Sequence, residues 1–209
     1  SENEEIAEAK EIFTKAVARH GRAQASDFLD VVDEDGKTVG SFARSFDLIV
    51  TAPHATNQDE EHMSASPDMI ALQSGRPVLI VPKEYDAPGL STHVLVAWDG
   101  KRASARAIGD AMPMLEEKGK VTILTIGNET PAGTDRMIQN LRRHRIETDH
   151  LQKTKSGSIG ETILETAQDI GADLIVMGAY EHSKFAHDVF GGVTTDILKG
   201  MKIPVFMSH

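Results

Sequence analysis

The chain of 209 residues contains no cysteine. This absence excludes disulfide bonds, a thiolate nucleophile, and zinc or iron–sulfur sites built on cysteine ligands. Long apolar runs are also missing, since the longest, such as residues 78–81 and 174–177, are far too short to cross a bilayer. The sequence therefore predicts no transmembrane helix.

Basic charge is scarce as well, because 22 Lys and Arg stand against 32 Asp and Glu, a formal net charge of −10. Such a charge repels phosphate backbones and anionic lipid, so we expect neither nucleic acid nor membrane as a partner. Arg142, Arg143 and Arg145 are assigned to a helix end, with nucleic-acid binding a remote alternative. The acidic first five residues lack the parts of a secretory signal, so a cytoplasmic location is the default expectation.

The sequence contains an internal repeat. Residues 47–50, Asp-Leu-Ile-Val, recur as residues 173–176, and Pro77–Val81 is matched by Pro204–Met207, at offsets of 126 and 127. Two matches at nearly one offset predict a duplicated unit. We expect a partial, degenerate unit in residues 1–90 and a complete unit in residues 91–209, joined by a linker with the Pro88-Gly89 turn signal. The acidic excess lies in residues 1–90, so an anionic ligand is more plausible in residues 91–209.

The second unit alternates between strand and helix patterns, which predicts a doubly wound parallel sheet with helices on both faces. Pro113 should kink the first helix or end it early. The expected strands are His93–Trp98, Val121–Ile126, Glu147–Leu151, Asp173–Met177 and Pro204–Ser208.

The first unit begins with a helical pattern at Glu4–Arg19 and lacks counterparts of the opening strand, helix and strand. An opening strand is central in a doubly wound sheet, and its loss would expose backbone groups on its neighbours. We therefore expect the chain to be a fragment of a longer one. The remaining elements expected here are strands near Phe28–Val32, Asp47–Thr51 and Pro77–Val81, and helices near Val39–Phe46 and Asp68–Gln73.

Ligands of open α/β sheets bind beyond the carboxyl ends of the strands. Two loops of the second unit qualify, one at Ala97–Gly100 and the other from Met177 to Thr194. Glycines before a helix let backbone N–H groups approach a phosphate, and a carboxylate such as Asp99 can accept hydrogen bonds from a ribose.

The motif Asp-Leu-Ile-Val-Met-Gly, a glycine pair thirteen residues later, Val-Thr, a helix and a terminal Pro-Val strand resemble the universal stress protein family. The likeness covers residues 92–209, with a worn copy in residues 1–90, so the chain resembles a tandem member. The resemblance implies a five-stranded parallel sheet of strand order 3-2-1-4-5, duplicated here. It also implies ATP binding through an Asp after the first strand and a motif of Gly, two residues, Gly, nine residues, Gly and Ser or Thr.

Carried over by position, the aspartate is Asp99, the first and third glycines are Gly178 and Gly191, and Ile126 lies beside adenine. Two positions depart, because Glu181 replaces the second glycine and Gly192 replaces the Ser or Thr. The first unit lacks the glycines, so we expect it to be a structural partner. The predicted nucleotide-binding residues are Ala97, Trp98, Asp99, Ile126, Met177, Gly178, His182, Ser183, Gly191, Gly192, Val193 and Thr194.

Each of these residues also has a purely structural interpretation. Asp99 with Gly100 forms an ordinary turn and helix cap, Trp98 is more often a packing residue, and Gly191 with Gly192 is by itself a tight turn. His182 and His187 with Asp188, and His54 and His62 with Glu61, lack HExxH spacing and a third ligand. We therefore predict no metal beyond Mg²⁺ accompanying ATP.

No Gly-x-Ser-x-Gly elbow or P-loop is present, so no catalytic residue is predicted. The leading function is a regulatory or protective binding module with ATP as candidate ligand. Two alternatives stay open. The second candidate is a dimerising scaffold that binds no nucleotide, and the third is a nucleotide hydrolase. Pro77–Val81 and Pro204–Ser208 are apolar edge strands, and the resemblance implies that they pair across the two units or across a dimer.

Overall fold

The computed structural model describes residues 2–21, 25–29, 39–53, 66–86, 92–117, 119–179 and 192–209. The chain forms two compact units, Ser1–Lys37 and Thr38–His209. The first unit contains helix α1 (Glu2–His20), which includes the predicted helix, and the rings of Phe13 and Phe28 lie 5.6 Å apart. The predicted strand near residues 28–32 falls mostly outside the described residues.

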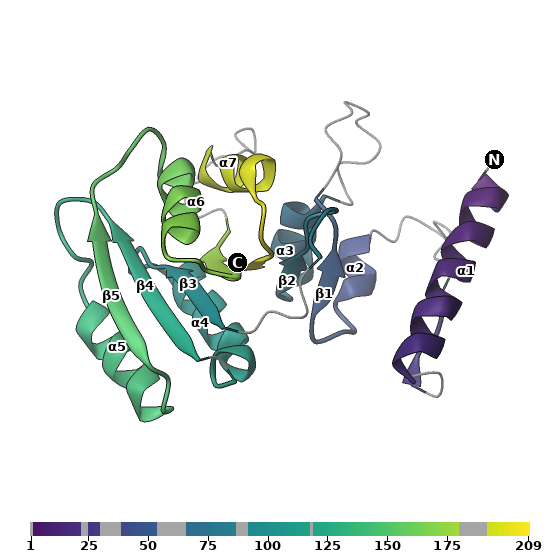
Figure 1. The fold of residues 1–209 in the computed structure, drawn as a ribbon, viewed down its shortest axis with the longest axis horizontal. Helices are drawn as coiled ribbons and strands as arrows, with labels where there is room; N and C mark the ends of the chain where they lie inside the picture. The colour runs from purple at the N-terminus through teal and green to yellow at the C-terminus, as the bar shows by residue number, and fades with distance from the viewer. Residues whose placement is uncertain are drawn as a thin grey trace. The chain divides into compact units, whose positions relative to one another are not determined.

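The second compact unit, Thr38–His209, is built on one seven-stranded sheet in the order β1-β2-β7-β6-β3-β4-β5 (Figure 1). All neighbours are parallel except β2 and β7, and β5-β4-β3-β6-β7 is the predicted 3-2-1-4-5 order. The strands are β1 (Ile49–Thr51), β2 (Val78–Ile80), β3 (His93–Ala97), β4 (Lys120–Ile126), β5 (Thr148–Lys153), β6 (Leu174–Gly178) and β7 (Val205–Ser208). The helices are α2 (Val39–Ala43), α3 (Pro67–Ser74), α4 (Arg102–Leu115), α5 (Thr134–Arg143), α6 (Ile159–Asp169) and α7 (Gly192–Gly200).

Helices cover both faces of the sheet, with α6 and α7 on one side and α4 and α5 on the other (Figure 1). Strand β6 shows why its sequence is continuously apolar. Leu174 and Val176 pack in the core beneath α4, whereas Ile175 and Met177 pack in the core beneath α6 and α7. Alternate side chains thus enter different cores, as expected for a strand buried on both faces.

Helix ends follow the local sequence. Helix α6 begins with a capping box in which the Ser158 side chain accepts from the Glu161 N–H and the Glu161 side chain accepts from the Ser158 N–H. Helix α4 contains Pro113 and ends two residues later, at Leu115. Proline supplies no N–H for the carbonyl four residues earlier and its ring clashes with that carbonyl, so an end close to Pro113 agrees with the expectation that it kinks or ends the helix.

The two parts of the repeat join through β2 and β7. These strands pair antiparallel, with Leu79 opposite Phe206 at the centre. The predicted pairing across the two units is therefore confirmed. Each of the two strands is bonded on both sides, β2 by β1 and β7, and β7 by β2 and β6. The boundary between residues 90 and 91 stays a prediction, because both predicted units contribute strands to one sheet.

A salt bridge connects β4 and β5 at the end where β4 begins. Lys120 Nζ lies 2.7 Å from Asp149 Oδ2. The hydrogen bond to Asp149 raises the pKa of Lys120, and the same bond lowers the pKa of Asp149. Because both side chains are exposed to water, we expect the pair to add little to stability. Among the described helices, none is long and apolar enough to span a membrane.

Candidate functional site

The candidate site lies at the edge of the sheet where β3, β4 and β6 end. From β3 the chain proceeds to β4 and β5 on one side, and it then returns to β6 and β7 on the other side. The order of strands thus changes direction between β3 and β6, which is the place where open α/β sheets bind ligands. This topology brings the loop after β3, with Asp99, beside the end of β6 at Gly178.

The carboxylate of Asp99 is held in place by the start of helix α4. Its Oδ1 atom accepts a hydrogen bond from the Lys101 backbone N–H at 3.0 Å and one from the Ser104 hydroxyl at 2.6 Å. Ser104 is buried, whereas the Asp99 side chain is 49% exposed. Asp99 is therefore held at the beginning of α4 through Oδ1, and about half of its side chain stays exposed.

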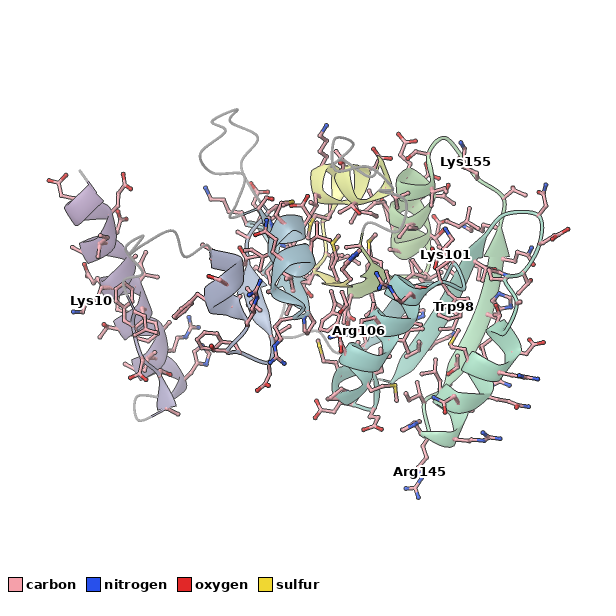
Figure 2. All side chains as sticks on the ribbon, turned by 180° about the vertical axis from the view of Figure 1, so that it is seen from behind. Lys10, Trp98, Lys101, Arg106, Arg145 and Lys155 are labelled. Carbon is pink, nitrogen blue, oxygen red and sulfur yellow. The ribbon has the colours of Figure 1, made fainter. Side chains whose placement is uncertain are left out.

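Positive charge lies close to this carboxylate. The Nζ atom of Lys101 is 3.9 Å from Asp99 Oδ2, and the Lys101 side chain is 41% exposed. The amino end of α4 adds the partial positive charge of a helix terminus. Figure 2 shows Lys101 at the start of α4, with Lys155 in the loop that follows β5. These surroundings suit an anionic ligand whose neutral part contacts Asp99.

Gly178 ends β6 directly against helix α4. A Cβ atom placed on Gly178 would lie 2.5 Å from the backbone nitrogen of Ser104 and 2.6 Å from the carbonyl carbon of Ala103. Real Cβ atoms do not approach backbone so closely, so only glycine fits here. The close packing of a strand against a helix thus explains this glycine without a phosphate.

Trp98 belongs to the hydrophobic core. It is 9% exposed and packs among the residues beneath α4 and α5. Its indole N–H donates to the Thr134 hydroxyl at 3.0 Å, and that hydroxyl lies 2.6 Å from the carbonyl oxygen of Pro131. Figure 2 shows Trp98 at the end of β3. Trp98 is therefore a packing residue. Its side chain helps to hold the loop that carries Asp99 in place.

The other predicted residues divide by burial. Ala97 and Ile126 are half-buried at the ends of β3 and β4, where they can line a ligand. Met177 and Thr194 are buried, with 3% and 2% exposure, so their side chains belong to the interior. At the start of α7, Val193 is half-buried, and Gly192 is exposed, with no described residue within 4 Å of its Cβ position.

Several predicted residues lie outside the described part of the chain. They are His182, Ser183 and Gly191, together with Glu181 and the candidate metal residues His54, Glu61, His62, His187 and Asp188. Within the described ranges, no group of three or more His, Asp or Glu side chains is arranged to hold a metal ion.

Sequence reasoning missed Ser104, and it named Gly100 only as part of an ordinary turn. Ser104 anchors Asp99, and its position five residues after an Asp-Gly turn was the available signal. Gly100 adopts a φ of 77°, and a Cβ there would lie 2.8 Å from the Pro131 side chain. The turn therefore requires glycine both for its backbone angle and for its contact with the loop after β4.

Comparison with known proteins gives consistent results. The family model described as the universal stress protein family matches residues 91–209. The chain is 27% identical over 170 residues to universal stress protein Slr1230 of Synechocystis, which covers 77% of this chain and 57% of that protein. The chain therefore spans little more than half of this curated relative.

A solved structure shares the fold. A universal stress protein from Archaeoglobus fulgidus DSM 4304 has a TM-score of 0.73 at 17% identity. The match covers 99% of this chain and 77% of the Archaeoglobus chain. Another from Archaeoglobus fulgidus was solved in complex with dAMP, with a TM-score of 0.43 at 18% identity, covering 57% of this chain and 98% of its own. That ligand is a property of that protein. Because the family model matches more than half of the residues, the chain belongs to the universal stress protein family.

Proposed function

We propose that residues 91–209 bind an adenine nucleotide, with ATP as the ligand, and that the protein acts as a regulatory or protective binding module in the cytoplasm. The observation that supports this most is the carboxylate of Asp99. Two hydrogen bonds to Oδ1 fix its orientation at the switch point of the sheet, and about half of the side chain is exposed. A pre-oriented acceptor of this kind suits the hydroxyl groups of a ribose.

In this proposal each part of the nucleotide meets a different element. Asp99 Oδ2 accepts from the ribose, and Ile126 at the end of β4 lies beside the base. The phosphates lie toward Lys101 and the amino end of α7, where N–H groups and the helix dipole favour anions. Mg²⁺ accompanies the phosphates. These groups bind and orient, and no nucleophile or general base among them is arranged for a covalent step.

The alternative is a scaffold that binds no nucleotide. Gly192 favours it, because this position has no hydroxyl donor at the amino end of α7. The negative charge of Glu181 in the same motif also favours it. Self-association through β2 and β7 remains part of this alternative, and it would require opening the pairing of these strands within the chain. A nucleotide hydrolase is the third candidate, and ATP turnover that Asp99→Ala abolishes would identify it.

The first test separates the charge of the Asp99 carboxylate from a hydrogen bond that holds it in place. Asp99→Asn keeps the shape but removes the charge, and a hydrogen bond to a charged group is worth about 1.5–3 kcal/mol, so we expect ATP affinity to fall by about 10- to 100-fold. Ser104→Ala removes a partner of Asp99 Oδ1 and leaves the carboxylate, so affinity should fall by less than about 5-fold. Isothermal titration with MgATP measures both, after thermal melts confirm folding. Equal losses in the two variants would show that Asp99 acts only as a cap.

The second test restores the hydroxyl that Gly192 lacks. Among the described residues nothing lies within 4 Å of the Cβ position of Gly192, so we expect Gly192→Ser to be accommodated without strain. One additional hydrogen bond to a phosphate contributes about 1 kcal/mol, and we expect ATP to bind about 5-fold tighter. Gly109→Ser, at an exposed glycine of α4 that also has open space, is the control and should leave affinity unchanged. An unchanged affinity in Gly192→Ser would argue against phosphates at the amino end of α7.

A further inference from the structure

Helix α5 presents basic and amide side chains to solvent. Its apolar residues Ile138 and Leu141 are buried in the core beneath α4 and α5. The exposed residues on the opposite side of the helix are Arg136, Gln139, Asn140 and Arg143. They are three and four positions apart, so they form one row along the helix. At a rise of about 1.5 Å per residue, the row is about 10 Å long. No acidic side chain belongs to it.

Two further basic residues at the end of α5 have structural partners. Arg142 Nη2 donates to the Thr148 carbonyl at 3.0 Å, which ties the end of α5 to β5. His144 Nδ1 lies 2.7 Å from Glu116 Oε1, which ties the end of α5 to the end of α4. These contacts explain Arg142 and His144 without an external partner.

Arg145 occupies a position that favours glycine. Its φ is 63°, and among the described residues it is the only one other than glycine with a positive φ. The Arg145 N–H donates to the Arg142 carbonyl, and the Ile146 N–H donates to the Leu141 carbonyl. This pair of bonds is the common way in which a helix ends in a left-handed residue. Figure 2 shows the Arg145 side chain pointing away from the end of α5.

Other helices of the chain have glycine at this place. Helices α1, α3 and α6 are followed by Gly21, Gly75 and Gly171, with φ values of 65°, 67° and 64°. The end of α6 even shows the same pair of hydrogen bonds, made by Gly171 and Ala172. Glycine adopts the left-handed conformation without the steric cost that a Cβ atom imposes. Arg145 therefore costs stability relative to glycine, and such an outlier indicates a function for its side chain.

The remaining arginines have no ionic partner within the described ranges. No carboxylate there lies within salt-bridge distance of Arg136, Arg143 or Arg145. Acidic residues border this stretch on both sides, since Asp135 precedes Arg136 and Glu147 follows Arg145 by two positions. The end of α5 is therefore a short basic surface on a chain with a formal net charge of −10.

We propose that this surface, formed by Arg136, Gln139, Asn140, Arg143 and Arg145, binds an acidic helix of a partner protein. Carboxylates three and four residues apart on such a helix form a row of the same spacing as the arginines. Each guanidinium can hold a carboxylate through two parallel hydrogen bonds. The two amide side chains supply hydrogen bonds between the charged pairs, and Arg145 extends the row beyond the last turn of α5.

A nucleic acid fits this surface less well. A duplex carries one negative charge about every 1.7 Å along its axis, so it would extend past the arginines and meet Asp135, Glu116 and Glu147. Single strands are held by stacking on aromatic rings, and residues 134–149 contain no Phe, Tyr or Trp. A short acidic helix ends before it reaches the bordering carboxylates.

The test uses the intact chain and a fluorescein-labelled, alanine-rich peptide with glutamates three and four residues apart. We expect saturable binding at one peptide per chain by fluorescence anisotropy, and weaker binding as added salt screens the charges. A matched peptide with glutamine in place of every glutamate should show no saturable binding. A labelled DNA duplex should bind more weakly than the glutamate peptide.

The arginine variants give the decisive comparison. Arg136→Gln and Arg143→Gln should each weaken binding by about 2- to 5-fold, as expected for exposed ion pairs. Arg145→Gly should weaken binding by a similar factor and at the same time raise the melting temperature, because it relieves the backbone. A residue with a structural role alone would not change these two quantities in opposite directions. Lys199→Gln, at an exposed lysine in the last turn of α7, is the control and should bind as the unaltered chain does.

Four results would overturn the proposal. The first is equal binding of the glutamate and glutamine peptides, or no saturable binding of either. The second is unchanged affinity in all three arginine variants. The third is a DNA duplex that binds more tightly than the glutamate peptide and is released by the same substitutions, which would identify a nucleic acid as the partner. The fourth is a dimer in sedimentation that Arg143→Gln dissociates, which would identify a second copy of the chain.

Discussion

Replacing Gly178 with alanine is expected to destabilise the protein by about 3 kcal/mol or more, because overpacking against rigid backbone is relieved only by shifting whole elements. The added methyl group would lie 2.5 Å from Ser104 N and 2.6 Å from the Ala103 carbonyl carbon. Neither atom belongs to a flexible side chain, so helix α4 would have to move away from β6. Urea denaturation measures the change in the free energy of unfolding.

The matched control is Gly192→Ala, at another glycine of the same sequence motif. No residue that the structure describes lies within 4 Å of its Cβ position, so the change should cost less than about 1 kcal/mol. If the two variants were equally stable, the contact between α4 and β6 would be looser than the structure describes. Gly178 would then have to be explained by a ligand rather than by packing.

Replacing Trp98 with alanine is expected to cost about 3–5 kcal/mol, the usual range for removing a large buried aromatic side chain. The indole is 9% exposed and packs in the core beneath α4 and α5. Thr134→Val removes only the hydroxyl that accepts from the indole N–H, and it should cost about 1 kcal/mol. The same denaturation experiment separates the two contributions.

Trp98→Phe distinguishes a core residue from one that stacks on a ligand. It keeps most of the apolar volume, so we expect a folded protein whose affinity for ATP changes by less than about threefold. A larger loss of affinity at unchanged stability would place the indole in the nucleotide site. That outcome would contradict the burial of the ring described above.

The fold was predictable from sequence because both faces of the central strands are buried. Continuous apolar runs such as residues 174–177, alternating with helical spacing, specify a parallel sheet covered on both sides. Strand β5 was predicted at residues 147–151 and is found at Thr148–Lys153. This strand is at the edge and largely exposed, so no buried pattern marks where it ends.

The candidate site was predictable only in part. An Asp-Gly pair directly after an apolar strand located Asp99, because the carboxyl ends of parallel strands share one edge. Ser104 was not found, since its bond to Asp99 depends on how α4 begins. The direction of the Trp98 side chain likewise depends on the packing of α4 and α5. Gly178 was correctly singled out, but its contact with Ala103 and Ser104 is tertiary and leaves no local signal.

The central claim is that residues 91–209 bind an adenine nucleotide through Asp99. The most direct measurement is mass spectrometry of the small molecules that acid releases from freshly purified protein, with Asp99→Asn purified in parallel. The account predicts ATP or ADP at close to one molecule per chain, greatly reduced in the variant. An empty protein that also fails to bind added ATP would contradict the claim and would favour the scaffold.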